Sequence, residues 1–107
     1  MKNLTFTEYA VKGIQSLKNL ENQDYIKDFE NQLDRIRYYG EKAGQALEYK
    51  YGRDLRGYYK IYFADQSWRI VYKEIDSKFE LIEITLVGPR DSVYKMADII
   101  INGKWLY

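Results

Sequence analysis

The chain has 107 residues, of which 46% are apolar and 31% charged, and its formal net charge is +1. This length fits one domain, residues 1–107, with a modest core. The absence of cysteine and histidine excludes disulfides, zinc-finger sites, thiol nucleophiles and histidine acid–base catalysis. No apolar run reaches the roughly 18 residues of a membrane span, and the N-terminus lacks the apolar core of a signal peptide. We therefore expect a soluble, cytoplasmic protein with no membrane partner.

The first part of the chain predicts a short strand followed by two helices. Residues 4–7 read as the strand, and residues 8–20 repeat apolar side chains at helical spacing. A second helix follows, capped by Asn22 or Asp24 and ending near Gly40. The apolar positions of the two helices are Val11, Ile14, Leu17 and Leu20 in the first and Ile26, Phe29, Leu33 and Ile36 in the second.

The second part changes to alternating periodicity rich in aromatic residues, which is typical of strands. Three strands are predicted at 58–63, 68–74 and 79–87, with turns between them. One face of these strands is expected to pack against the helices. Its side chains are Ile61, Phe63, Ile70, Tyr72, Ile82, Ile84 and Leu86.

A short helix with Asp91 or Ser92 as its cap is predicted to follow the last strand and to end at Gly103, leaving a tail at 105–107. Its apolar stripe is Val93, Met96, Ala97 and Ile100. The predicted fold is therefore α+β, in the order β-α-α-β-β-β-α. We expect a small antiparallel sheet with the first two helices packed on one face as a helical hairpin, and all helices on that face.

Positive charge is concentrated in the middle of the chain. Residues 1–49 carry seven cations against eight carboxylates, whereas residues 50–73 carry six cations against two carboxylates. Such a stretch favours a polyanionic partner, although ordinary solvated strand ends have the same composition. The residues concerned are Lys50, Arg53, Arg56, Lys60, Arg69 and Lys73, with Asp54 and Asp65.

Four side chains are candidates for a site at one end of the sheet. Lys60 and Arg69 are expected on the open sheet face, with Arg90 just past the last strand and Tyr94 one helical turn later. Fixed cations stabilise the negative charge that develops when a 2′-hydroxyl attacks the adjacent phosphate, and arginine grips phosphate through two parallel donors. We assign Arg69 and Arg90 to the phosphate.

Proton transfer falls to Lys60 or Tyr94, because the chain has no histidine. Lys60 acts as the base or as an electrostatic helper, and Tyr94 stacks on a nucleobase or shares the proton transfer. Each candidate also has a simpler interpretation. Arg69 can pair with Glu83 across a strand, and Arg90 with Asp91, whereas Lys60 can be a solvated lysine and Tyr94 a tyrosine at the edge of the core.

Three segments together resemble the second half of the RelE/ParE-type toxins of bacterial toxin–antitoxin pairs. They are residues 55–61 (LRGYYKI), residues 68–72 (WRIVY) and residues 87–94 (VGPRDSVY). The resemblance implies a compact, metal-independent endoribonuclease without a cofactor, which cleaves mRNA on the ribosome and is silenced by a cognate antitoxin. It also implies a functional set, carried over to this chain as Lys60, Arg69, Arg90 and Tyr94.

RNA contacts are expected from Lys50, Arg53, Arg56 and Tyr62. The chain departs from the RelE pattern at Tyr62, where a second basic residue is frequent, and at Pro89 before the terminal arginine. A tyrosine at position 62 can still stack on a base. Two alternatives remain: a ParE-like toxin that inhibits DNA gyrase without nuclease activity, and a decayed phage or plasmid binding module.

Overall fold

The computed structural model describes residues 1–50 and 52–103, although not the side chain of Lys50. The tail expected at 105–107 lies outside these residues. The elements are β1 (Asn3–Phe6), α1 (Glu8–Asn19), α2 (Gln23–Tyr39), the 3₁₀ helix η1 (Gly40–Ala43), β2 (Gln45–Lys50), β3 (Arg53–Phe63), β4 (Trp68–Asp76), β5 (Leu81–Pro89) and α3 (Arg90–Asn102). In this part of the chain no helix is long and apolar enough to cross a membrane.

Side-chain caps define the starts of α1 and α2. The Thr7 hydroxyl accepts a hydrogen bond from the Ala10 amide at 3.0 Å, and the Asn22 side chain accepts one from the Tyr25 amide at 3.1 Å. These bonds satisfy amides that have no partner inside the helix. Of the two caps predicted for α2, Asn22 is therefore the one used. Gly40 ends this helix as predicted, with a φ of 58°.

The five strands form one sheet in the order β1-β5-β4-β3-β2. Neighbouring strands are antiparallel except for β1, which runs parallel to β5. The sheet is therefore mixed, and the prediction of a purely antiparallel sheet is wrong at this edge. Strand β2 was not predicted, because Leu47 is its one buried apolar residue and its pairing with β3 shifts register between Ala46 and Glu48.

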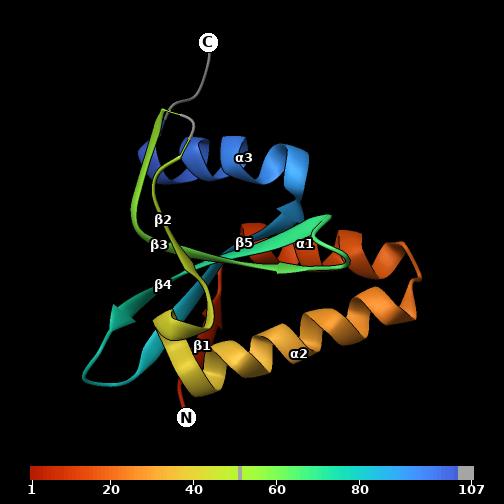
Figure 1. Ribbon diagram of the computed structural model, residues 1–107, viewed down its shortest axis with the longest axis horizontal. Helices are drawn as coiled ribbons and strands as arrows, with labels where there is room; N and C mark the ends of the chain where they lie inside the picture. Colours follow the sequence, from red (N-terminus) through yellow and green to blue (C-terminus); the bar gives the residue numbers. More distant parts are fainter. Residues whose placement is uncertain (51, 104–107) are drawn as a thin grey trace.

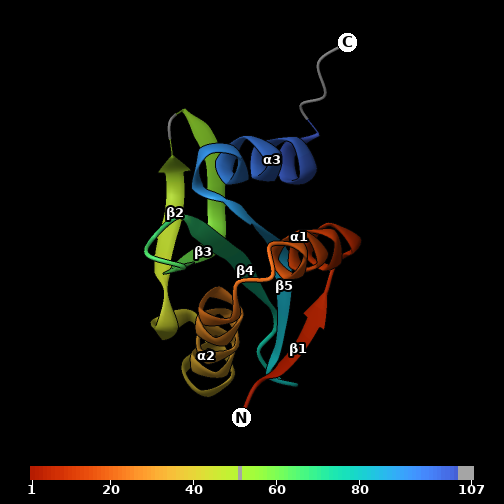
Figure 2. The ribbon, with the colours of Figure 1, turned by 90° about the vertical axis from the view of Figure 1, so that its right-hand side faces the viewer.

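Helices cover both faces of the sheet: α1 and α2 share one face, as predicted for the helical hairpin, whereas the prediction that the last helix joins them there is wrong. The first cluster of buried residues joins Leu17 of α1 and Phe29 of α2 to the sheet. The second joins Val93 of α3 to Val71 and Leu86 on the opposite face. Figures 1 and 2 show α3 on one side of the sheet and α2 on the other.

A bulge in β5 explains why Leu86 lies on the α3 face rather than with Ile82 and Ile84. Tyr72 pairs with Ile84 and Val71 pairs with Leu86, so Thr85 is an extra residue between the two pairs. An extra residue reverses the faces that later side chains occupy. The cluster under α1 and α2 consequently contains Val87 in place of Leu86.

Helix α3 follows β5 without a loop. Its N-cap is Pro89, which makes no side-chain cap bond, so the predicted caps Asp91 and Ser92 are wrong and both lie in the first helical turn. The helix ends at Gly103, as predicted, with a φ of 65°. The start of β3 lies near the end of this helix (Figure 1), where the Asn102 side chain donates to the Asp54 carbonyl at 2.9 Å.

Candidate functional site

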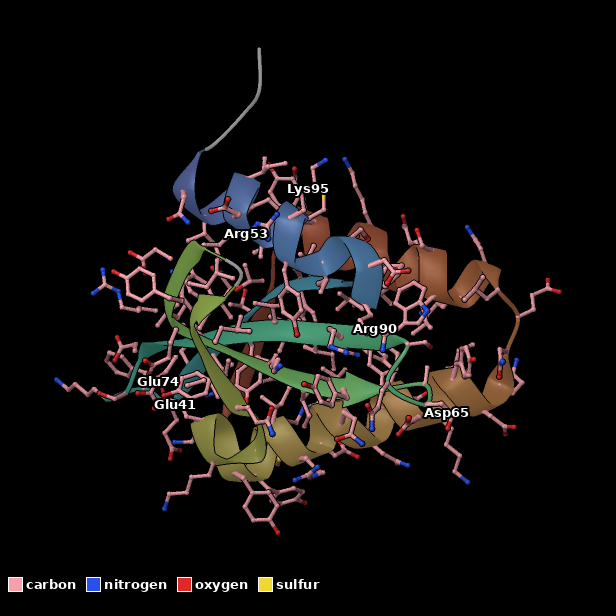
Figure 3. The ribbon with its side chains drawn as sticks, turned by 45° about the horizontal axis from the view of Figure 1, so that its top comes forward. Glu41, Arg53, Asp65, Glu74, Arg90 and Lys95 are labelled. Carbon is pink, nitrogen blue, oxygen red and sulfur yellow. The ribbon has the colours of Figure 1, made fainter. Side chains whose placement is uncertain are left out.

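All four predicted catalytic residues line one pocket of about 490 Å³ between the sheet and α3. We call it the cationic pocket. Figure 3 shows Arg90 at the start of α3 and Lys95 further along that helix, with Arg53 of β3 nearby. The lining residues are Arg53, Lys60, Tyr62, Arg69, Arg90, Asp91, Tyr94 and Lys95.

Strand register brings these side chains together. Tyr62 pairs with Arg69 across β3 and β4, and Arg69 pairs with Gly88 across β4 and β5. The last strand therefore lies beside β4, as the predicted convergence required. The Arg69 guanidinium carbon lies 3.8 Å from the centre of the Tyr62 ring, and the Lys60 Nζ lies 4.8 Å from the same ring. Both distances are within the range of cation–π contacts.

Arg69 is held by acceptors from three directions. Its Nε donates to the Tyr94 hydroxyl at 3.4 Å, and its Nη1 donates to the carbonyls of Gln66 and Trp68. The alternative pairing with Glu83 is wrong, because Glu83 lies opposite Lys73 in the sheet. Arg69 is therefore a fixed cation whose orientation is set by the protein.

Lys60 and Arg69 are each only 5% exposed. The prediction that they lie on an open face, and the simpler reading of Lys60 as a solvated lysine, are therefore wrong. The cause is α3, which packs over this face and adds Tyr94, also buried, beside them. The Lys60 Nζ lies 5.6 Å from the centre of the Tyr94 ring. Cations in such a site are less screened by water than on an open sheet face.

The β3–β4 turn fixes the positions of both arginines. Ala64, Asp65 and Gln66 all have left-handed backbones, with φ values of 54°, 53° and 68°. Residues without glycine's freedom pay about 1–3 kcal/mol each for such conformations, which persist where the surroundings hold them. Here the Gln66 carbonyl accepts from the Arg69 side chain, while the neighbouring Ser67 carbonyl accepts from the Arg90 amide at 2.8 Å.

Arg90 differs from Arg69 in its exposure. Its side chain is 62% exposed, and its Nε lies 3.9 Å from the carboxylate of Asp91, which is itself almost fully exposed. The predicted simpler pairing therefore exists. A solvent-exposed ion pair of this kind contributes at most about 1 kcal/mol, so it leaves the guanidinium able to exchange Asp91 for a stronger anion.

Positive charge dominates the cationic pocket. Its lining includes five cationic side chains and a single carboxylate, that of Asp91. Arg53 is partly neutralised by Asp98, with 3.6 Å between its Nε and the carboxylate. Figure 3 shows Glu41 and Glu74 together at a distance from Arg90. The excess of cations in the lining gives the pocket a field that attracts anions.

The residues predicted to bind RNA lie in different places in the structure. Arg53 and Tyr62 line the cationic pocket, whereas Arg56 does not. Arg56 instead donates twice to the Asp54 carboxylate, at 2.8 Å each, and lies over the Tyr49 ring. The bonds to Asp54 also raise the pKa of Arg56. The Lys50 side chain is outside the described part of the structure.

Sequence reasoning missed Lys95 and Asp91 as members of the pocket. The available signal was their helical spacing: the pair Arg90 and Asp91 precedes the pair Tyr94 and Lys95 by three to five residues, about one helical turn. Residues three and four apart share a helix face. That spacing identifies the pocket-facing side of α3 once α3 is known to cover the sheet.

A second hollow, of about 350 Å³, lies between α1 and α3 and is largely apolar. Its walls include Tyr9 of α1, Leu20 directly after α1 and Met96 of α3, all of which are exposed. Gly13 allows α1 to approach the sheet closely here, because a Cβ at this position would lie 1.9 Å from the Val87 carbonyl oxygen.

The chemistry of the cationic pocket is that of anion binding. Its guanidinium and ammonium groups donate hydrogen bonds, and its two tyrosine rings offer stacking surfaces. The described residues include no group of three or more carboxylates that could hold a metal ion. No protein-family model matches the chain, and neither a curated protein nor a solved structure matches it.

Proposed function

We propose that the protein is the toxin of a bacterial toxin–antitoxin pair, a RelE-like endoribonuclease that cleaves mRNA without a metal or cofactor. The observation that carries the proposal is the contact between Arg69 and Tyr94 inside a pocket that Lys60 and Arg90 also line. Two guanidinium groups, an ammonium and a phenol around one cavity are the groups that this reaction requires.

In the proposed reaction, the ribose 2′-oxygen attacks the adjacent phosphorus while its proton passes to a base. The bond from phosphorus to the 5′-oxygen breaks, and that oxygen takes up a proton. The products are a 2′,3′-cyclic phosphate and a free 5′-hydroxyl. Lys60 or Tyr94 exchanges the protons, and water takes no part in the bond changes.

Arg69 and Arg90 have complementary roles in this scheme. Arg90, at the exposed mouth, captures the phosphate by replacing its weak Asp91 contact. Arg69 is already oriented by Gln66, Trp68 and Tyr94, so it stabilises the developing charge without reorganising. Tyr62, beneath the Arg69 guanidinium, provides a surface for a base.

The proposal includes three partners: mRNA, the ribosome on which it is read, and a cognate antitoxin protein. The exposed apolar side chains along the hollow between α1 and α3 support the antitoxin, because clustered exposed apolar surface is typical of protein interfaces. The cationic pocket supports the nucleic acid partner through its charge.

The second candidate is a ParE-like toxin that inhibits DNA gyrase and does not cut RNA. It is favoured by the burial of Arg69, whose guanidinium already has three partners inside the protein. In that case Arg69 stabilises the fold around α3, and the exposed cations bind a protein or DNA surface. A decayed binding module is the third possibility.

Inducible expression in a bacterial host tests the proposal. We expect wild-type protein to arrest growth and to create new mRNA 5′ ends, and Arg90→Ala to lose both effects. Lys27→Ala, which removes an exposed cation from α2, is the matched control and is expected to behave as wild type. Arrest without new 5′ ends would favour the gyrase candidate, and no arrest would favour the decayed module.

A further inference from the structure

A smaller hollow adjoins the cationic pocket on the side of α2. It has a volume of about 190 Å³, and we call it the α2 hollow. Lys60 and Tyr62 line both spaces, so β3 forms their common wall. The polar side chains that belong only to the α2 hollow are Gln32, Arg35 and Gln45.

Helix α2 orients two of these side chains. Gln32 donates through its Nε2 to the Asp28 carboxylate at 3.2 Å, and its Oε1 accepts from the Arg35 Nη1 at 3.3 Å. The three residues lie on one face of the helix because they are four and three positions apart. The Gln32 amide therefore lies between a carboxylate and a guanidinium, which fixes its orientation.

Arg35 has weak partners for a guanidinium. Its contacts are neutral oxygens, the Gln32 amide and the Ala43 carbonyl at 3.5 Å. Among the described residues it forms no ion pair, and it is exposed to solvent. Its donors are thus available to a ligand that supplies acceptors in the α2 hollow.

We propose that the α2 hollow binds a single RNA base, with a preference for guanine. This inference rests on the proposed RNA cleavage, and it concerns the nucleotide next to the one whose phosphate occupies the cationic pocket. An RNA strand that crosses β3 passes from the cationic pocket to the α2 hollow over the Tyr62 ring, because Tyr62 lines both spaces. The volume is below the range for drug-sized ligands, so it fits a unit as small as one base.

Arg35 determines the preference for guanine. Guanine presents two neighbouring acceptors, O6 and N7, and the parallel donors of an arginine match them. Adenine replaces the O6 acceptor with an amino group, which opposes those donors. Gln45, paired with Lys60 in the sheet register, adds an amide at the opposite wall. Single-stranded RNA exposes these base edges for such readout.

Binding of labelled RNA, measured by fluorescence anisotropy, tests the inference. The probes are a short single-stranded oligoadenylate and the same chain with one guanine, both carrying 2′-O-methyl riboses that prevent cleavage. We expect wild type to bind the guanine probe about ten-fold more tightly, within the discrimination of one bidentate contact. Arg35→Ala and Arg35→Lys should abolish this difference, because neither retains the paired donors.

The control separates base readout from general electrostatics. Lys27→Ala removes an exposed cation from the same helix and should keep the preference for guanine. The inference is supported when Arg35→Ala loses the preference for guanine and its affinity for the oligoadenylate stays within about two-fold of that of Arg35→Lys. Equal affinities of wild type for the two probes, or retention of the preference in Arg35→Ala, would overturn it and leave the nuclease proposal standing. Failure of wild type to bind either probe would also overturn the inference, whereas growth arrest and new mRNA 5′ ends on expression decide the nuclease proposal separately.

Discussion

The Nε of Arg69 lies 3.4 Å from the hydroxyl oxygen of Tyr94, a contact between residues 25 positions apart in the chain. It joins the central strand β4 to α3 at the floor of the cationic pocket. The two side chains thereby fix each other's orientation, and the pocket depends on the docking of α3 as much as on the sheet.

Removing only the Tyr94 hydroxyl isolates its contribution. Tyr94→Phe keeps the ring that packs in the second cluster but deletes the acceptor for Arg69. We expect the free energy of unfolding to fall by about 1 kcal/mol, the usual contribution of one hydrogen bond. RNA cleavage should fall at least ~100-fold if the hydroxyl transfers a proton. Unaltered cleavage in a folded variant would remove Tyr94 from the reaction.

Substitutions of Arg69 and Arg90 should differ in their effect on stability while both abolish cleavage. Arg69→Met removes the donor that the carbonyls of Gln66 and Trp68 share, the bond to Trp68 being buried, so we expect a loss of about 2 kcal/mol in denaturant unfolding. Arg90→Ala removes an exposed side chain and should change stability by less than about 0.5 kcal/mol. Cleavage should be lost in both, and a large destabilisation by Arg90→Ala would contradict the assignment.

The strained β3–β4 turn offers a substitution that should stabilise the protein. Gln66 is exposed and has a φ of 68°, which glycine adopts without steric cost. Gln66→Gly keeps the backbone carbonyl that Arg69 uses, so we expect a net stabilisation of about 0.5–1 kcal/mol after the entropic cost of glycine. Thermal unfolding measures it, with the exposed Gln15→Gly in α1 as the control that should destabilise.

Gly13 should tolerate no side chain. The Cβ of an alanine would meet the Val87 carbonyl oxygen at 1.9 Å, which forces α1 away from β5. We expect Gly13→Ala to lower the free energy of unfolding by about 2 kcal/mol, even though alanine favours helix by ~1 kcal/mol. Gln15→Ala, exposed on the same helix, should stabilise or leave stability unchanged. Denaturant unfolding of the two variants measures both changes, and a Gly13→Ala variant as stable as wild type would contradict the prediction.

Stability should decline at alkaline pH because of Tyr72. Burial raises its pKa above the ordinary value of 10, and its hydroxyl donates to the Gly40 carbonyl at 3.0 Å. Above pH 10 the unfolded chain loses this proton while the folded protein retains it, so unfolding becomes more favourable as pH rises. The decline should approach about 1.4 kcal/mol per pH unit for this group.

Tyr72→Phe is the control for that decline. It should be less stable than wild type near neutral pH, through loss of the bond to Gly40, but its stability should fall less steeply above pH 10. Some decline remains because burial and Glu41 also raise the pKa of Tyr59. Parallel curves for wild type and variant would show that Tyr72 is not the group responsible.

Much of the fold follows from local patterns in the sequence. The helices α1 and α2 follow from apolar spacing, with Asn22 as one of the two caps predicted for α2, and Gly40 and Gly103 end helices where glycine accepts a left-handed backbone. These signals depend on neighbours within a few residues, so they are readable without a tertiary structure. The α+β class and the three central strands follow in the same way.

The errors arise where a distant partner decides the outcome. Thr85 bulges because β4 and β5 shift register there, and that shift moves Leu86 to the other face. Strand β1 joins the sheet parallel to β5, a pairing between residues about 80 positions apart by the register of Asn3 with Leu81. Hydrophobic alternation within one strand contains no information about either event.

The sequence by itself determined which side chains were available for the site: Lys60, Arg69, Arg90 and Tyr94 were identified from residue type and order. Only the tertiary structure decided their surroundings. Docking of α3 buries Lys60 and Arg69, brings Lys95 into the same pocket and leaves Arg56 outside it. The physical reason is that charge and hydrogen-bonding capacity belong to a residue, whereas burial and the partners that orient it depend on elements far away in the chain.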